Sequence, residues 1–230
     1  MPALLTLDAN KMRAAQPRAA FTRREGSLIE AARTPRQVQR WLRGVPYNRE
    51  RRGESLRSFR GVLQRGRAHC LEAVFVALTV MHQHGWPTWV LDIESQDGLD
   101  HVLFLYQRDG RWGTVARSRD EGLHGRPAVY RSVAALVESY MDPYVDATGR
   151  IVGYGVADLD QLVRTDWRFG EGDVWAVEKA LLRMPHQRIV MPAARYTAVR
   201  DRYAELYERW GKPTARTVRR WYGAQVEGWW

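Results

Sequence analysis

The stretch Ala68-His-Cys-Leu-Glu-Ala-Val-Phe-Val-Ala-Leu-Thr-Val-Met-His-Gln-His84 decides the fold. Its apolar residues recur at helical spacing and cover most of the helix circumference: Leu71, Val74, Phe75, Leu78 and Met81. Gly85 and Pro87 follow and end the helix. Because a helix that is apolar on nearly every side has to be buried, we predict that it lies inside the core, with Cys70 in its first turn.

Upstream of this helix the sequence predicts a loose N-terminal arm followed by short helices. Residues 1 to 24 have no clear period, whereas Ser27-Leu-Ile-Glu30 has the pattern of a capping box. Thr34-Pro35 places a proline at the first position of a second helix, which ends at Gly44. We assign residues 1–44 to this N-terminal part and expect residues 45–66 to form a polar loop with one helical turn.

Downstream of it the periodicity changes to that of strands. Residues 88–93 form a short apolar run, and residues 101–107 and 111–117 flank Asp109-Gly110, a strong hairpin signal. A helix is expected over residues 131–141. The order helix, three strands, helix predicts an α+β fold, with an antiparallel sheet and a core over residues 45–149.

Residues 150–230 are predicted to be a helical C-terminal extension. Helical pieces are expected over 158–184, and a longer helix from Ala194 carries aromatic residues at helical spacing. Another helix is expected from Thr214. Arginines alternate with these aromatic residues, a pattern that suits contact with nucleic acid but is more typical of an amphipathic helix that packs its aromatic face inward.

Composition excludes several classes of protein. The chain has 230 residues, 45% of them hydrophobic and 27% charged, which is typical of a globular protein. Its single cysteine, Cys70, excludes a disulfide within the chain and a zinc site of the multi-cysteine kind, and we assign no metal and no cofactor. No apolar run reaches 18 residues and no secretory signal is recognised, so we expect a cytoplasmic protein without membrane contact.

The net charge is +10, and nearly all of the positive charge is arginine. Such a surface attracts phosphates nonspecifically, but the favoured explanation is that the arginines reflect a GC-rich genome and are simply solvated. The charge alone therefore does not identify a nucleic-acid partner.

Cys70 is the candidate nucleophile. The N-terminus of a helix carries unsatisfied N–H groups and about half a positive charge, and both favour a thiolate over a thiol. The alternative is that Cys70 is a small buried apolar residue.

His101 is the candidate proton carrier, at the start of the strand that follows Asp100. If Asp109 and Gly110 are the two loop residues of the hairpin, the numbers of paired residues add to 219, and His101 faces Ser118. A hydroxyl there would orient the imidazole, as the third member of a catalytic triad does. In the alternative, Ser118 only ends its strand.

These pieces resemble the transglutaminase-like superfamily, in particular poorly characterised bacterial members. The resemblance lies in Cys70-Leu-Glu-Ala, Gly85-Trp-Pro-Thr-Trp-Val-Leu-Asp-Ile, Asp100-His-Val-Leu-Phe-Leu-Tyr and Asp109-Gly-Arg-Trp-Gly. It covers roughly residues 45 to 145. It implies a papain-like core with a Cys-His-Asp triad, and an oxyanion donor upstream of the cysteine, for which Tyr47 and Asn48 are the nearest candidates.

The chain departs from the family pattern at two positions. Leu71 follows the cysteine where many members have tryptophan, and Ala116 stands where the family has its aspartate. Ser118, on the same strand face, is one replacement for that aspartate. A different carboxylate is the other, with three candidates: Glu72, Asp100 and Asp120.

The resemblance implies an enzyme that acts on amide or peptide carbonyls through a thioester at Cys70, with hydrolysis, deamidation or transamidation as the outcome and a protein or peptide as the substrate. Two alternatives stay open. One is a catalytically silent domain that binds a protein partner, and the other is a basic protein associated with nucleic acid.

Overall fold

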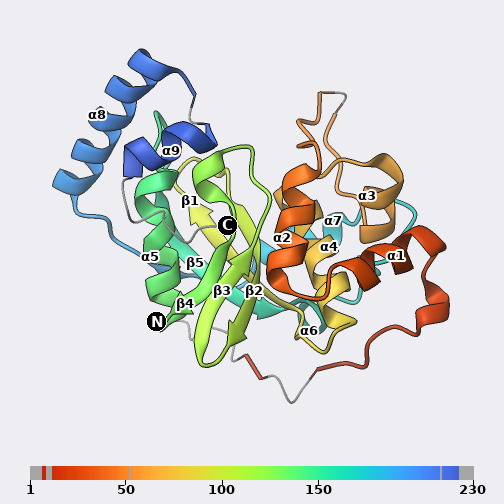
Figure 1. The fold of residues 1–230 in the computed structure, drawn as a ribbon. Coiled ribbons are helices and arrows are strands. Elements are labelled where there is room, and N and C mark those ends of the chain that lie inside the picture. The colour runs from red at the N-terminus through yellow and green to blue at the C-terminus, as the bar shows by residue number, and fades with distance from the viewer. Residues whose placement is uncertain (1–6, 9–11, 52, 213, 223–230) are drawn as a thin grey trace.

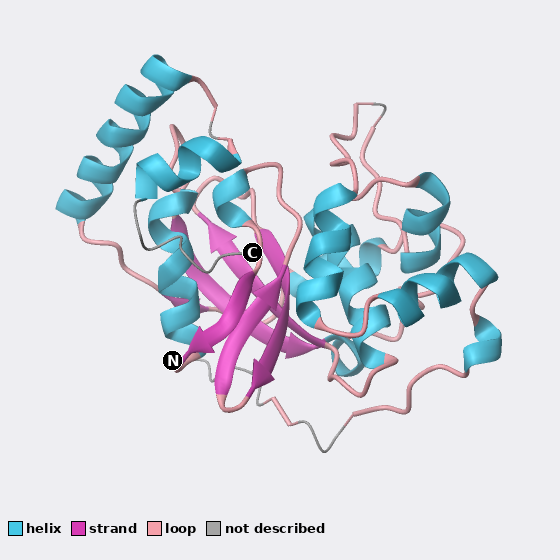
Figure 2. Cartoon of the chain, in the orientation of Figure 1, coloured by secondary structure: helices cyan, strands magenta, loops and turns pink. Residues whose placement is uncertain are grey.

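The computed structural model describes residues 7–8, 12–51, 53–212 and 214–222. Its centre is a six-stranded antiparallel sheet in the order β4-β3-β2-β1-β5-β6 (Figures 1 and 2). The strands are β1 (Trp89–Ser95), β2 (His101–Arg108), β3 (Arg111–Val115), β4 (Arg126–Tyr130), β5 (Ile151–Asp158) and β6 (Gln187–Arg188). The described part of the chain is therefore mixed α and β, as predicted.

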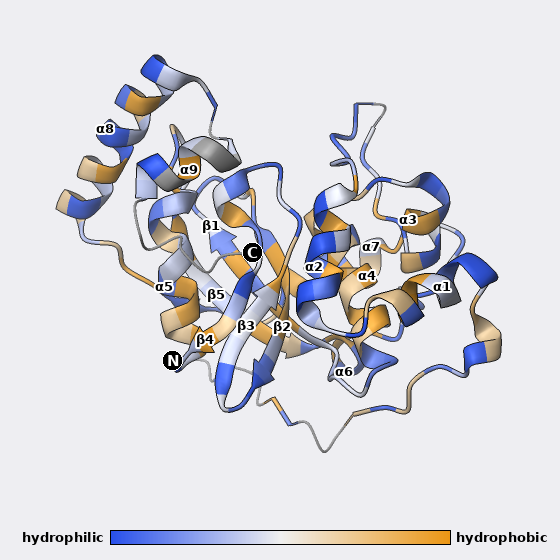
Figure 3. Cartoon of the chain, in the orientation of Figure 1, coloured by the Kyte–Doolittle hydropathy of each residue, from blue (hydrophilic) through white to orange (hydrophobic). Residues whose placement is uncertain are grey.

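The central helix α4 (Cys70–His82) packs on one face of the sheet, chiefly against β2. All of its residues from Leu71 to His82 are buried, which confirms the prediction from its apolar pattern. Around it lie α1 (Arg23–Ala31), α2 (Pro35–Gly44), α3 (Phe59–Arg65) and α7 (Trp175–Leu181). In Figure 3 much of α4 has the colour of hydrophobic residues, whereas the tip of the β2–β3 hairpin has the colour of hydrophilic ones.

The two faces of the sheet have separate cores because side chains alternate along a strand. In β2, Val102, Phe104 and Tyr106 belong to the core that contains α4. Leu103 and Leu105 belong to the other core, against α5 (Val133–Tyr144). The sheet is thus covered by helices on both faces.

The β2–β3 hairpin has the predicted register. Pairs run from Arg108↔Arg111 to Phe104↔Val115, and Asp109 and Gly110 both have positive φ, at 51° and 71°. Those angles are what a tight two-residue turn between twisted strands needs. The ladder stops at Val115, however, so the pairing does not reach Ser118.

At the N-terminus one helix start is confirmed and another is corrected. Thr34 caps α2 and accepts a hydrogen bond from the Gln37 N–H at 3.3 Å. The capping box of α1 is formed by Thr22 and Glu25, not by Ser27, which lies inside the helix and donates to the Arg23 carbonyl. The helix begins earlier because Thr22 and Glu25 satisfy each other's backbone N–H groups first.

The prediction of an all-helical region after residue 149 is wrong for two elements, β5 and the short edge strand β6 (Gln187–Arg188). β5 (Ile151–Asp158) pairs with β1 along its whole length and is an inner strand of the sheet. A Cβ on Gly155 would lie 2.6 Å from Met184 Cε and 3.0 Å from the Pro185 carbonyl oxygen. Its glycines thus serve close packing, although in the sequence they indicate a loop.

The helices of this region are as expected: α6 (Leu159–Leu162), α7, α8 (Ala193–Trp210) and α9 (Ala215–Tyr222). α8 projects from the edge of the molecule beside α9 (Figure 1). Among the described residues, no helix combines the length and the apolar character needed to cross a membrane.

Candidate active site

Cys70 is the first residue of α4 and is half-buried. Glu72, fully buried in the first turn, holds this end of the helix in place. Its carboxylate accepts hydrogen bonds from the His69 N–H at 3.0 Å and the Arg57 N–H at 3.0 Å. A carboxylate there also complements the partial positive charge of the helix end.

His101 begins β2 and is buried. Its Nε2 lies 2.8 Å from the Leu123 carbonyl oxygen. Because a carbonyl oxygen only accepts hydrogen bonds, Nε2 must carry a proton, and Nδ1 is the nitrogen left to exchange one. Leu123 ends the 3₁₀ turn Glu121–Leu123, so a backbone group of that turn fixes the tautomer.

The thiol and the imidazole meet. His101 and His69 both hydrogen-bond to the Cys70 side chain. Burial by itself raises the pKa of the Cys70 thiol, but these hydrogen bonds and the charge of the two rings lower the pKa to about 5. At neutral pH the sulfur is therefore a thiolate, the nucleophilic form.

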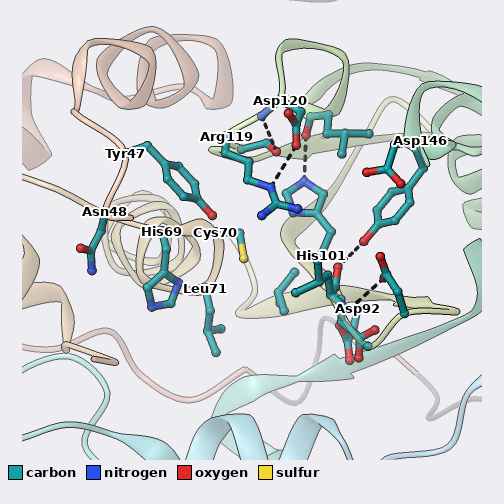
Figure 4. A pocket seen from close by; sticks show the side chains of 18 of the residues that line it. Tyr47, Asn48, His69, Cys70, Leu71, Asp92, His101, Arg119, Asp120 and Asp146 are labelled. Atoms are coloured by element: carbon teal, nitrogen blue, oxygen red, sulfur yellow. Dashed lines mark hydrogen bonds and ion pairs between the residues drawn. The ribbon is translucent and has the colours of Figure 1, made fainter. Parts of the chain in front are cut away.

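His69 is a site residue that the sequence analysis missed. Figure 4 shows the sulfur of Cys70 between the rings of His69 and His101. His69 Nε2 lies 2.9 Å from the Ser55 carbonyl oxygen and 3.8 Å from Glu72 Oε2. Burial lowers the pKa of His69, but the Cys70 thiolate and Glu72 outweigh it and raise the pKa to about 9. The only signal in the sequence is that His69 adjoins Cys70 at a helix start.

Ser118 does not orient His101. Its hydroxyl accepts a hydrogen bond from the Asp120 N–H at 3.1 Å, and the ring nitrogen that needs a partner has the Leu123 carbonyl instead. The pairing fails because β3 ends at Val115 and the chain leaves the ladder. Ser118 still lines the same cleft.

The three candidate carboxylates have other partners. Glu72 holds the helix start, Asp100 accepts from the Ser95 N–H at 2.7 Å, and Asp120 lies 3.2 Å from Arg119 and 2.8 Å from Lys212. Within the described residues, no carboxylate is in ion-pair contact with His101. The third group of this site is therefore a backbone carbonyl.

The two oxyanion candidates separate in the structure. The amide Nδ2 of Asn48 donates to Ser55 Oγ at 3.0 Å and to Glu72 Oε2 at 3.2 Å, so both of its hydrogens are used. Tyr47 points its hydroxyl toward Cys70 (Figure 4), and the Cys70 backbone is hydrogen-bonded to it. Burial raises the pKa of Tyr47, so its hydroxyl keeps its proton and can donate.

Cys70 and His101 line a cleft of about 610 Å³. The C-terminal helices also contribute to its wall, with Glu178 from α7, Tyr203 from α8 and Tyr222 from α9. This volume is within the range of sites for small molecules or peptide side chains. Among the described residues no cluster of His, Cys, Asp and Glu side chains is arranged to hold a metal ion.

Comparison with known proteins adds no identity to this geometry. No protein-family model matches the sequence, and no curated protein sequence is significantly similar to it. The resemblance to the transglutaminase-like superfamily therefore remains a prediction, and the functional argument depends on the site itself.

Proposed function

We propose that the protein is a cysteine-dependent enzyme that acts on amide or peptide carbonyls through a thioester at Cys70. The observation that carries the proposal is the meeting of one thiol with two imidazoles at a helix start, where the pKa of Cys70 is lowered to about 5. A cysteine that only fills space in a core has a raised pKa and no such partners. The order of a cysteine on a helix and a histidine on the adjoining sheet also supports the papain-like arrangement that the resemblance implies.

The two histidines have different roles in this proposal. His69 stays charged up to a pH of about 9, since its pKa is raised to that value, and so it stabilises the thiolate without exchanging a proton. His101, held by a neutral carbonyl, exchanges the proton at Nδ1. This division allows the nucleophile to stay ionised while the other ring works as acid and base.

In the first half of the reaction the Cys70 thiolate attacks the carbonyl carbon, and a C–S bond forms as the oxygen becomes an oxyanion. We assign the Tyr47 hydroxyl, which points toward Cys70 and keeps its proton, as the donor to that oxygen. His101 Nδ1 then gives its proton to the leaving nitrogen, the C–N bond breaks, and an amine and a thioester remain.

In the second half water or an amine gives a proton to His101 Nδ1 and attacks the thioester. The C–S bond breaks and the Cys70 thiolate is regenerated. With water the products are a carboxylic acid and the amine, which is hydrolysis or deamidation; with an amine the product is a new amide.

The test uses glutamine-containing and ordinary peptides, with three assays: ammonia release, peptide cleavage and incorporation of a fluorescent amine. Wild-type protein is compared with Cys70→Ala, His101→Ala and, as a matched control, His84→Ala. His84 lies beyond the far end of α4. We expect activity that Cys70→Ala abolishes, that His101→Ala lowers by about 10²-fold or more and that the control retains.

Activity that survives Cys70→Ala would refute the proposal. The proposal would also be refuted if the reactivity of Cys70 had the pH dependence of an ordinary thiol and the protein were inactive on every peptide. That pair of results would favour a catalytically silent binding domain. The nucleic-acid alternative stays a prediction that a binding assay at 0.2 M salt would test.

A further inference from the structure

The cleft around Cys70 is acidic, although the protein as a whole has a net charge of +10. Arg49 and Arg119 are the arginines among its described lining residues, and Arg119 is already paired with Asp120 at 3.2 Å. Carboxylates are more numerous in the lining. Those without a cationic Arg or Lys partner among the described residues include Glu50, Glu54, Asp97, Asp100 and Glu178.

On the sheet side, Asp92 is 2% exposed and lines the cleft. Its Oδ2 lies 3.1 Å from His186 Nε2, but its Oδ1 is buried and has no hydrogen-bond partner among the described residues. Such an orphaned carboxylate oxygen is costly unless a donor reaches it. Asp100 lies nearby, and burial together with the charges of Asp92 and Glu94 raises the pKa of Asp100.

On the helix side, Glu178 of α7 projects into the same cleft. Burial raises the pKa of Glu178; the charge of His69 lowers it, and the charges of Glu54, Glu50 and the Cys70 thiolate raise it. Glu178, Glu50 and Glu54 thus share this side of the cleft, and none of them has an Arg or Lys partner among the described residues. The thiolate itself is compensated by His69 and His101, so the excess negative charge of the cleft comes from these carboxylates.

We propose that the substrate of this site carries a positive charge, an ammonium or a guanidinium group, next to the amide that Cys70 attacks. The proposal rests on the proposed function and adds the substrate class to it. A cationic group of the substrate would supply the donor that Asp92 Oδ1 lacks and relieve the repulsion at Asp100 and Glu178. An acidic peptide would meet the same repulsion and bind weakly.

The first experiment measures the charge preference of the site without a substrate. Cys70 is the only cysteine in the chain, so its modification can be followed by intact mass. At low ionic strength we would measure the rate at which Cys70 reacts with two methanethiosulfonate reagents, one with a trimethylammonium group and one with a sulfonate group. Each rate is divided by the rate at which the same reagent reacts with free mercaptoethanol. The ratio of the two normalised rates, cationic over anionic, reports the charge preference of the site. We expect this ratio to favour the cationic reagent.

Asp100→Asn and Glu178→Gln should each lower the ratio about fourfold. A unit charge about 10 Å away in water changes the local concentration of a monovalent ion about twofold in each direction, and the two reagents have opposite charges. Asp109→Asn is the matched control, because Asp109 lies at the exposed tip of the hairpin. A normalised ratio of one or below in the wild type, or equal ratios in all variants, would overturn the proposal.

The second experiment compares peptide amides that differ in one side chain: arginine, lysine, citrulline and glutamate. Citrulline has nearly the shape of arginine without its charge, so a preference of arginine over citrulline in kcat/KM isolates the charge. If only the arginine peptide, or only the lysine peptide, has a higher kcat/KM than the citrulline peptide, that result identifies which cation fits the site. Equal rates with arginine, lysine, citrulline and glutamate would refute the cationic substrate while leaving the proposed enzyme intact, whereas inactivity with an unreactive thiol would refute the enzyme itself.

Discussion

The sharpest prediction concerns the reactivity of Cys70 at acidic pH and its dependence on His69. The pKa of Cys70 is lowered from 9.0 to about 5. At pH 6 the thiolate fraction is then about 0.9, against about 10⁻³ for an ordinary thiol. A thiolate of lower pKa is intrinsically less nucleophilic, by roughly 60-fold over this difference, so the net acceleration of disulfide exchange at pH 6 is about 15-fold.

The assay follows the reaction of Cys70 with a pyridyl disulfide from pH 4 to pH 10. Because the folded-state pKa is depressed, the rate should rise through a midpoint near pH 5 and stay high at neutral pH. In His69→Ala the loss of one cation beside the sulfur should move that midpoint upward by about one to three pH units. His84→Ala, far from the thiol, is the control. A wild-type midpoint above pH 8, or an unchanged midpoint in His69→Ala, would refute this account of the site.

Three further predictions follow from the contacts of the fold. Ser118→Ala should change catalytic activity by less than about threefold in a peptide assay, because the Leu123 carbonyl holds the His101 ring. Gln39→Leu should lower the free energy of unfolding by about 2–4 kcal/mol, measured by urea titration. The reason is that the buried amide of Gln39 hydrogen-bonds to both backbone groups of Ala116 and to the Gly125 N–H. A loss below about 0.5 kcal/mol would contradict this prediction. Gly155→Ala should cost about 1–3 kcal/mol in the same assay, because the added methyl group meets Met184 and the Pro185 carbonyl, and an unchanged midpoint of unfolding would show that the site has room.

Local patterns in the sequence determined α4 and the hairpin. The apolar residues of α4 can be satisfied only by burial, and Asp109-Gly110 can adopt the positive φ angles of a tight turn. Both signals are confined to neighbouring residues, which is why they could be recognised without the fold. β5 was missed for the converse reason: Gly155 breaks a strand pattern locally, and only the packing of Met184 against it explains its place there.

The same distinction applies to the candidate site. The sequence by itself placed Cys70 at a helix start and His101 at a strand start, because both positions follow from local element boundaries. It could not show that His69 lies beside the sulfur. It also could not show that the Leu123 carbonyl, and not Ser118, orients the His101 ring. Side-chain direction at a helix cap and the path of the chain after β3 are set by contacts between residues distant in sequence.

The acidic lining of the cleft was decided by the tertiary structure alone. Asp92 on β1 and Glu178 on α7 are 86 positions apart in the chain and share the cleft only because α7 and the sheet enclose it. The net charge of the sequence, +10, predicts the opposite sign. Charge summed along a chain describes the average surface, whereas the potential in a cleft depends on which few charges folding brings together.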